Sequence, residues 1–373
     1  MKDLLVTSHT PAMRSGRALR TYGIARALAS HGGLTLLYVR FGATEPDAMF
    51  SGIPGVELVE VVPSRGLRRM IAYGTARLAG VPDGFARGIS PELLGEATRL
   101  AAEPDRGRVI ADGPIAAAAL TPLARSRPVV YNAHNLESGF RHDLEERGLG
   151  SPRALRAFER QLLEGAVESW LVSEADIAAA RELCPHARLR YVPNVVDVEA
   201  IEPVSSPAGE PRAIFVASFA YEPNRNGLEF LLGQVFPRVW AELPEARLAL
   251  AGAGLEQPVS TDPRVEALGF VEDLGAAYAS ARCAVVPLLQ GGGTPLKFIE
   301  ALAYGLPVIA TPLAAAGLDV RDGEHCLLAE NAEEFAAALV RVLRDGAPAL
   351  GRRGRRLAAE RYSIHALGEL LAT

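Results

Sequence analysis

The sequence is poor in cysteine: its 373 residues include only Cys184, Cys283 and Cys326. Three cysteines this far apart do not make a disulfide framework or a zinc site, and they favour a reducing compartment. The seven histidines show no paired metal-ligand spacing, and no Asp-x-Asp pair is placed to carry a divalent ion. The sequence therefore predicts a protein without a bound metal.

Long hydrophobic runs are also missing. The longest uncharged stretch, 301–318, contains two glycines and two prolines that break it into a helix end, a strand and a loop. Residues 1–7 predict an immediate strand instead of a signal peptide, because no long apolar region follows the first charges. A formal net charge of −5 is not the basic footprint of a nucleic-acid-binding protein. We therefore expect a cytoplasmic protein that is not integral to a membrane and has no nucleic-acid partner.

Short apolar runs alternate with helical patterns along the chain, and 373 residues exceed what one ordinary core holds. Such alternation indicates parallel sheets covered by helices on both faces. We predict an α/β protein with two Rossmann-like, doubly wound parallel-sheet domains facing a central cleft. The expected strands lie near 4–6, 34–39, 56–59, 108–111, 128–132, 170–173, 212–218, 247–252, 265–269, 283–288 and 306–310.

The domain boundary is expected where this pattern changes, near residue 191. Residues 203–211 are rich in proline, serine and glycine, a composition typical of a linker. We assign 1–190 to the N-terminal domain, 191–211 to a hinge or linker, 212–355 to the C-terminal domain and 356–373 to a C-terminal helix.

The segment 291–311 carries the clearest chemical signal. Three glycines, Gly291 to Gly293, leave an apolar strand and open a helix. This turn points backbone amides and the positive end of a helix dipole at one spot, which suits a phosphate. Lys297 lies in the first helical turn, and Glu300, a turn later, can accept hydrogen bonds from sugar hydroxyls. The pattern predicts a nucleotide site; the alternative is a tight turn with a solvated lysine, since the glycines alone are a weak signal.

Several segments share the motifs and the order of a known family. They are 131–135, 192–197, 215–227, 248–254, 268–273 and 291–311. Together they resemble the family 4 glycosyltransferases, retaining enzymes of the GT-B fold, and especially the subgroup with Pro-Asn after the first strand of the donor domain. The resemblance covers essentially the whole chain and is loose before about residue 125.

The resemblance implies a donor site in the C-terminal domain. Glu300 would bind the donor ribose, and Phe270 and Val271 would lie against the nucleobase. The residues implied in binding the donor diphosphate are Gly16, Asn224, Arg225, Gly293, Thr294, Leu296 and Lys297. His134 would face the reacting sugar from the N-terminal domain, which makes His134 and Lys297 the implied catalytic residues. The alternative for His134 is a hydrogen-bonded loop residue.

The sequence departs from the family pattern at three places. Gly292 stands where the family has its first glutamate, and Pro295 has no N–H to give. The Arg and Lys that commonly grip the diphosphate would fall at Ser218 and Asn226. Lys297 would therefore carry a larger share of the phosphate charge.

The resemblance implies a metal-independent, retaining glycosyltransferase that moves a sugar from a nucleotide-diphosphate sugar to an acceptor hydroxyl, in glycan, glycolipid or natural-product biosynthesis. The nucleotide sugar is a co-substrate, and no cofactor is expected. The N-terminal domain would hold the acceptor, whether saccharide, lipid-linked or small natural product, and the C-terminal helix would cross back to that domain. Two alternatives stay open: a sugar-nucleotide epimerase of the same fold, and a degenerate member that binds nucleotide sugar without turnover.

The segment 65–78 is basic and partly amphipathic. Such a helix can dock on anionic lipid at the inner membrane face, near a lipid-linked acceptor. An equally compatible interpretation is a solvated helix with an apolar inner face. The sequence does not choose between the two.

Overall fold

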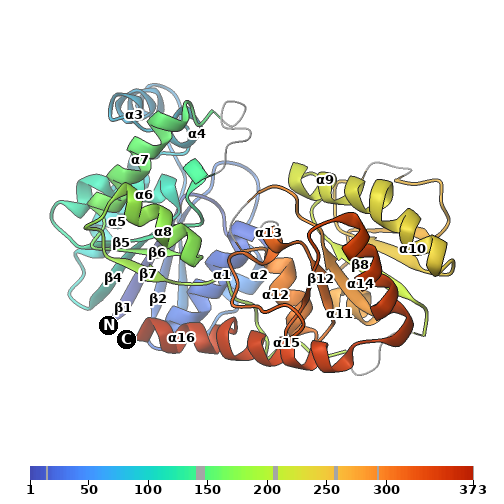
Figure 1. The fold of residues 1–373 in the computed structure, drawn as a ribbon. Coiled ribbons are helices and arrows are strands. Elements are labelled where there is room, and N and C mark those ends of the chain that lie inside the picture. The colour runs from blue at the N-terminus through green and yellow to red at the C-terminus, as the bar shows by residue number, and fades with distance from the viewer. Residues whose placement is uncertain (14–15, 140–147, 205–208, 256–258, 292–293, 373) are drawn as a thin grey trace. The chain divides into compact units, whose positions relative to one another are not determined.

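The structure is a computed structural model that describes residues 1–13, 16–139, 148–204, 209–255, 259–291 and 294–372 (Figure 1). The chain forms two compact units. The first comprises Met1–Asn194 with Leu367–Thr373, and the second comprises Val195–Ala366.

In the described part of the first unit, seven strands form one sheet in the order β3-β2-β1-β4-β5-β6-β7, and the adjacent strands pair in parallel. Their apolar runs are buried on both faces, as a sheet between two helical layers requires. The strands are β1 (Lys2–Thr7), β2 (Leu34–Val39), β3 (Val56–Val61), β4 (Arg106–Asp112), β5 (Val129–Asn132), β6 (Glu168–Leu171) and β7 (Leu189–Tyr191).

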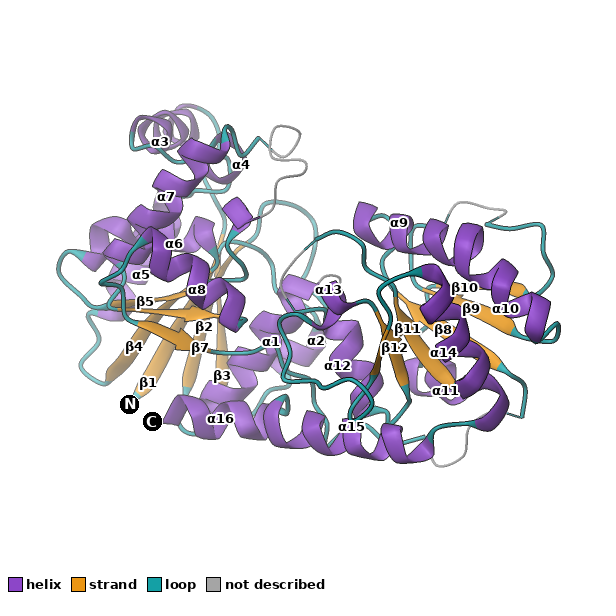
Figure 2. Ribbon diagram, viewed as in Figure 1, coloured by secondary structure: helices purple, strands orange, loops and turns teal. Residues whose placement is uncertain are grey.

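Helices cover both faces of this sheet (Figure 2). The helices of this unit are α1 (Gly16–Ala29), α2 (Ala48–Ser51), α3 (Leu67–Leu78), α4 (Asp83–Ala86), α5 (Pro91–Ala101), α6 (Pro114–Ala124), the 3-10 turn η1 (Glu137–Gly139), α7 (Pro152–Gly165) and α8 (Glu174–Leu183). None of the helices in the described residues is long and apolar enough to cross a membrane.

The second unit repeats this plan. Its described strands form a parallel sheet in the order β10-β9-β8-β11-β12-β13. The strands are β8 (Arg212–Val216), β9 (Arg247–Ala251), β10 (Val265–Gly269), β11 (Cys283–Val286), β12 (Val308–Ala310) and β13 (Leu327–Leu328). The helices are α9 (Glu222–Phe230), the π-helical turn η2 (Leu231–Val235), α10 (Phe236–Glu242), α11 (Leu274–Ala279), α12 (Leu296–Ala303), α13 (Pro312–Ala315), α14 (Ala332–Asp345) and α15 (Pro348–Arg361). The last helix, α16 (Ile364–Ala372), begins in the second unit and continues into the first. The predicted fold class, two doubly wound parallel-sheet units, is confirmed.

The core of the second unit lies on both sides of its sheet. Along β8, Ala213 and Phe215 belong to one hydrophobic cluster, and Ile214 between them belongs to the other. This alternation follows from the two-residue repeat of a strand. The Phe215 ring is also the one that the Lys297 ammonium contacts.

The helical segment that follows β8 is interrupted. It starts at Glu222, and the π-helical turn η2 separates α9 from α10. Pro237 explains the interruption, because its ring nitrogen has no N–H for the carbonyl four residues before it.

Residues 195–204, expected within the hinge, pack on the second unit. Val196 and Val198 are buried in its core, and the Val196 N–H donates to the Tyr362 carbonyl at 2.9 Å. At the other end of the chain, residues from Leu367 onward belong to the first unit. There the Arg108 guanidinium donates to the Leu371 carbonyl at 2.8 Å, and Arg190 donates to the Leu370 carbonyl. These arginines satisfy carbonyls that a helix C-terminus leaves without partners.

Two glycines on one face of α15 let that helix approach α12 closely. A Cβ atom at Gly351 would lie 2.0 Å from the Gly305 carbonyl oxygen, and one at Gly354 would lie 2.7 Å from Leu302. The end of α12 is thus fixed by backbone contact that admits no side chain.

We expect Gly351→Ala to destabilise the protein by at least about 1–3 kcal/mol, because the added methyl forces α15 away from the turn that ends α12. Gly95→Ala is the matched control. Gly95 also lies in a helix but has nothing within 4 Å of its Cβ position, so alanine there should stabilise by about 0.5–1 kcal/mol. Urea unfolding measures both. Equal effects of the two substitutions would contradict the close approach.

Candidate functional site

The loop before α12 shapes a polar site in the second unit. Gly291 has φ of +108°, a backbone conformation that favours glycine, and its Cβ position lies 3.7 Å from Pro223 in α9. Beside it, the Gln290 amide donates to the Glu222 carboxylate at 3.3 Å. The loop therefore runs along the start of α9. Pro295, the N-cap of α12, gives the first-turn amides no side-chain acceptor.

Lys297 is the centre of this site. Its ammonium donates a hydrogen bond to the Asn224 side-chain oxygen and lies 5.0 Å from the centre of the Phe215 ring. The Asn224 amide donates in turn to the Ser218 carbonyl at 2.7 Å, which fixes the oxygen toward the lysine. Asn224 is buried and Lys297 is half-buried.

Burial lowers the pKa of Lys297 to about 7, and the nearby carboxylate of Glu300 opposes that shift. For Glu300, burial raises the pKa, and Lys297 opposes the rise. The two groups lie one turn apart on α12, so each partly offsets the cost of burying the other's charge. An anion bound at Lys297 would favour the charged ammonium in the same way.

Glu300 lies near two tyrosines. The rings of Tyr278 and Tyr304 stack with their centres 4.6 Å apart. Burial raises the pKa of both hydroxyls, and the nearby Glu300 carboxylate adds to the rise. A carboxylate held beside flat apolar rings can accept hydrogen bonds from a bound hydroxylated molecule.

The other predicted donor residues are placed as follows. Thr294 is buried, and Leu296 and Val271 both pack against the same core cluster. The Phe270 side chain is 76% exposed. The Arg225 side chain is exposed, and its guanidinium donates to the Ala220 carbonyl at 3.0 Å. Gly293 lies outside the described residues. The structure thus brings Lys297, Asn224 and Glu300 together, while Arg225 contacts the backbone of its own loop.

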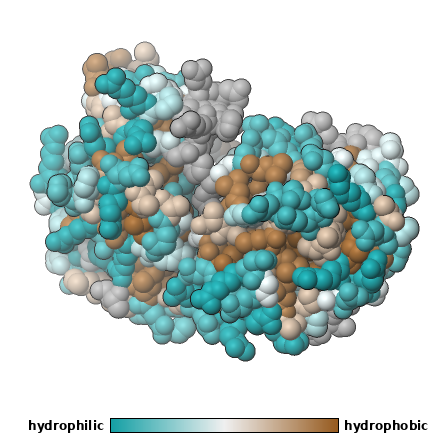
Figure 3. All heavy atoms as spheres, viewed as in Figure 1, coloured by the Kyte–Doolittle hydropathy of each residue, from teal (hydrophilic) through white to brown (hydrophobic). Residues whose placement is uncertain are grey.

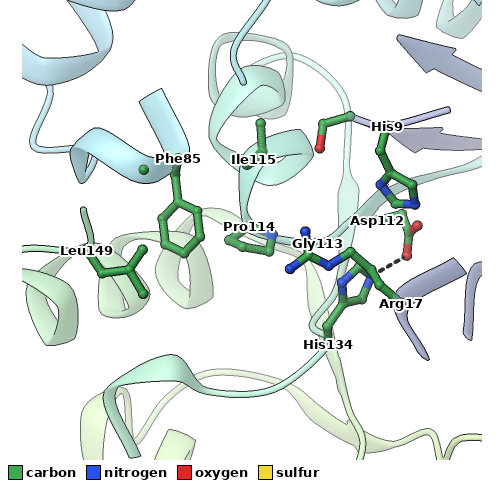
Figure 4. A pocket seen from close by; sticks show the side chains of 11 residues that line it. His9, Arg17, Phe85, Asp112, Gly113, Pro114, Ile115, His134 and Leu149 are labelled. Atoms are coloured by element: carbon green, nitrogen blue, oxygen red, sulfur yellow. Dashed lines mark hydrogen bonds and ion pairs between the residues drawn. The ribbon is translucent and has the colours of Figure 1, made fainter. Parts of the chain in front are cut away.

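Gly16 and His134 belong to the first unit. Gly16 is exposed and begins α1, and His134 follows β5 and lines a cavity of about 270 Å³ (Figure 4). The cavity is lined by Ser8, His9, Arg17, Gly84, Phe85, Asp112, Gly113, Pro114, Ile115, His134 and Leu149.

A buried polar network supports His134. The Asp112 carboxylate is fully enclosed and accepts from His134 Nε2 at 2.9 Å, from the Asn132 amide at 2.7 Å and from the Thr21 hydroxyl at 2.6 Å. Despite burial, which opposes ionisation, these contacts and His134 hold the pKa of Asp112 well below its usual range. Arg20, also buried, donates to the Asn132 side-chain oxygen at 2.6 Å and to the Val192 carbonyl at 3.0 Å.

Sequence reasoning predicted a site role for His134 and missed the residues that hold its ring. One signal was present: Asp112 and Asn132 end β4 and β5, which are neighbours in the sheet, so both side chains had to appear at the same edge. Arg20 and Thr21 gave no such signal, because a helical position does not reveal which buried group it will meet.

Two parallel sheets of this kind, each wrapped by helices, give the chain the GT-B fold. Sucrose-phosphate synthase from Thermosynechococcus elongatus is 18% identical and aligns over 100% of this chain and 98% of its own, with a TM-score of 0.75. HepE from Anabaena, solved in complex with UDP and glucose, is 16% identical over 99% of this chain and 98% of its own, with a TM-score of 0.70.

Sequence comparison adds a family match within the second unit. Residues 210–345 match the family described as Glycosyl transferases group 1. A phosphatidyl-myo-inositol mannosyltransferase from Mycobacterium leprae (strain TN) is 32% identical over 165 residues, which make up 41% of this chain and 44% of that protein. The chain therefore matches less than half the length of this curated relative.

We expect Lys297→Met to be more stable than the natural protein near pH 7, by about 1–2 kcal/mol after allowance for partial exposure. The pKa of Lys297 is about 7 in the folded protein, and its ordinary value is 10.5. Between about pH 7 and pH 10.5 the unfolded chain therefore binds more protons than the folded protein does. The free energy of unfolding of the natural protein should therefore rise with pH in that window, and the advantage of Lys297→Met should shrink.

Urea unfolding at pH 6, 7, 8.5 and 10 measures this dependence. Lys297→Arg is the control, because its guanidinium stays charged throughout and should leave no slope from this position. A difference between Lys297→Met and the natural protein that does not change with pH would contradict the shifted pKa.

Proposed function

We propose that the protein is a glycosyltransferase that transfers a sugar from a nucleotide-diphosphate sugar to an acceptor hydroxyl. The observation that carries this proposal is the group of Lys297, Asn224 and Glu300 around α12, inside the segment matched to Glycosyl transferases group 1. A half-buried lysine, a fixed amide and a carboxylate supply one cation and two hydrogen-bonding groups for a nucleotide sugar.

In this proposal Lys297 and the first amides of α12 hold the donor diphosphate. As the bond to the anomeric carbon breaks, negative charge builds up on the leaving diphosphate, and a positioned ammonium at a helix N-terminus stabilises it. The Thr294 hydroxyl, the Leu296 amide, Asn224, Gly293 and Gly16 complete the proposed diphosphate site. Arg225 joins them only if its guanidinium leaves the Ala220 carbonyl.

Glu300 is proposed to bind the donor ribose, with Phe270 and Val271 against the base. The exposed Phe270 ring supports this role, since an exposed ring can stack on a planar base. The presence of UDP and glucose in the HepE structure makes uridine diphosphate glucose the first donor to test.

Three finer points belong to the same proposal: the anomeric configuration is retained, no metal is needed, and His134 faces the reacting sugar. Lys297 supports metal independence, because it supplies at the diphosphate the charge that a divalent cation would otherwise bring. The epimerase and the degenerate binder are not favoured by the comparisons, which name transferases.

We expect Lys297→Ala and Glu300→Ala each to weaken binding of uridine diphosphate glucose by about tenfold to a hundredfold, the loss typical of a charge-assisted hydrogen bond. Calorimetric titration measures the affinities, and product analysis with an acceptor panel reports transfer and anomeric configuration. Glu360→Ala, an exposed position on α15, is the control and should bind as the natural protein does. Undiminished affinity in both Lys297→Ala and Glu300→Ala would overturn the donor site. An epimerised donor formed without acceptor would replace transfer with epimerisation.

We also propose that the protein works at the cytoplasmic face of a membrane, docked through α3. Leu67, Met70 and Ile71 on this helix are 71%, 69% and 59% exposed, and Leu78 is 91% exposed. Figure 3 shows apolar atoms beside hydrophilic ones where α3 lies in Figure 1. Arg65, Arg68 and Arg69 are exposed on the same segment, so the surface complements an anionic lipid headgroup layer.

Vesicle sedimentation tests this docking. Vesicles with anionic phosphatidylglycerol should retain the protein at low salt and vesicles of phosphatidylcholine should not, because each arginine near an anionic surface adds about 1 kcal/mol. The double variant Arg68→Gln, Arg69→Gln should bind at least about tenfold more weakly. The control pair Arg153→Gln, Arg156→Gln removes two exposed arginines of α7 and should bind normally. Retention that is independent of lipid charge or of Arg68 and Arg69 would contradict the proposal.

A further inference from the structure

The cavity of the first unit has two chemically different walls (Figure 4). His9, Arg17, Asp112 and His134 gather on one side, and Phe85 and Leu149 lie on the other. A molecule that fills it must therefore present polar groups to one wall and apolar surface to the other.

His134 lines the cavity and carries a hydrogen-bond acceptor that no described residue uses. Its Nε2 is hydrogen-bonded to the ionised Asp112 carboxylate, so in the neutral ring Nε2 carries the proton and Nδ1 carries a lone pair. Nδ1 is buried and has no hydrogen-bond partner within the described residues. A Cβ atom at Gly113 would lie 3.0 Å from the imidazole, so the backbone holds the ring in place. This lone pair suits the hydrogen of a ligand hydroxyl.

Arg17 supplies positive charge on the same wall. Its side chain is exposed and makes no ion pair in the part of the chain that the structure describes. The other charges nearby offset one another, because the Asp112 carboxylate lies near the buried Arg20 guanidinium. His9 adds no charge at neutral pH, since burial lowers its pKa to about 4. Among the described residues of this wall, Arg17 is therefore the cation available to an anionic ligand.

The opposite wall is apolar and rigid. The Phe85 ring stacks on Phe158 with centres 5.5 Å apart, and Ile115 extends the apolar surface. Phe85 lies in α4, which is joined to α3 by hydrogen bonds from Tyr73 to Asp83 and from Arg69 to the Arg87 carbonyl. The apolar wall thus belongs to the element next to the exposed face of α3.

We infer that this cavity binds the acceptor, and that the acceptor is an anionic amphiphile: a hydroxyl meets His134, a phosphate ester or similar anion meets Arg17, and an apolar chain lies against Phe85 and Ile115. The inference rests on the proposed glycosyl transfer and adds the chemical class of its acceptor. Asp112 is a positioning residue in it, because it fixes the tautomer that points a lone pair at the ligand.

Three related probes test the assignment in the full-length protein: 1-O-hexylglycerol 3-phosphate, 1-O-hexylglycerol without the anion, and glycerol 3-phosphate without the chain. We expect the complete probe to bind at least about tenfold more tightly than either truncated one and to shift the ring signals of His134 in NMR spectra. A spectrum of His134→Gln assigns those signals. Calorimetric titration gives the affinities.

Two variants test the charged wall and the apolar wall of the cavity separately. Arg17→Gln should weaken the complete probe by about tenfold and leave 1-O-hexylglycerol unaffected, because only the anion uses the guanidinium. Ile115→Thr, a half-buried position, should weaken both hexyl probes by about threefold and spare glycerol 3-phosphate. Arg181→Gln, an exposed arginine of α8, is the control and should change nothing.

Unchanged binding of the complete probe to Arg17→Gln would overturn the cavity assignment. An Arg17→Gln variant that loses affinity for uridine diphosphate glucose but still binds the complete probe normally would overturn it as well.

The cavity assignment and the proposed glycosyl transfer can fail separately. Probe binding without any donor binding leaves the cavity assigned and removes glycosyl transfer, whereas donor binding that depends on Lys297, with no probe binding, removes only the cavity assignment.

Discussion

Parallel pairing is the constraint on which both candidate sites depend. Wherever adjacent strands are described in either sheet they run parallel, so their carboxyl ends share one edge, and polar side chains that follow different strands meet there. Asp112 and His134 meet in this way after β4 and β5 in the first unit. Lys297 and Asn224 meet after β11 and β8 in the second. In both units the chemistry is assembled from residues far apart in the chain, on a sheet whose own faces are filled by apolar side chains.

The two sites treat charge differently. In the first unit the Asp112 carboxylate receives three hydrogen bonds and is stabilised in its ionised form, so His134 is held by a fully satisfied partner. In the second, the Lys297 ammonium makes one hydrogen bond to a described residue, Asn224, and burial lowers its pKa to about 7. A cation that is partly removed from water lowers the stability of the empty protein. The same desolvation strengthens its attraction to an anion that binds beside it. This contrast fits a fixed support in one unit and a diphosphate-binding group in the other.

The sequence foretold much of this architecture, because strand positions follow from short apolar runs and α12 follows from three glycines before an amphipathic pattern. It also singled out Lys297, Glu300 and His134 as candidate site residues, and their roles stay predictions. The contacts that Arg20 adds to the Asp112 network were not predictable, since Arg20 is separated from Val192 by 172 positions and nothing local marks such a pair. The π-helical turn before Pro237 was missed because a lost backbone hydrogen bond leaves the hydrophobic repeat nearly unchanged. Residues 195–204 fall within the expected hinge because they lead into the segment 203–211, which is rich in proline, serine and glycine. Val196 and Val198 are nevertheless core residues of the second unit.

All three cysteines are buried, and burial raises the pKa of Cys283 and Cys326 to about 12. Alkylating dyes react with an accessible thiolate, and these side chains offer neither access nor, at Cys283 and Cys326, the ionised form. The native chain is therefore a ready background for fluorophore attachment: one surface cysteine introduced in each unit would carry a dye pair without removing any natural thiol. Energy transfer between such dyes could follow the two units through a reaction cycle in solution.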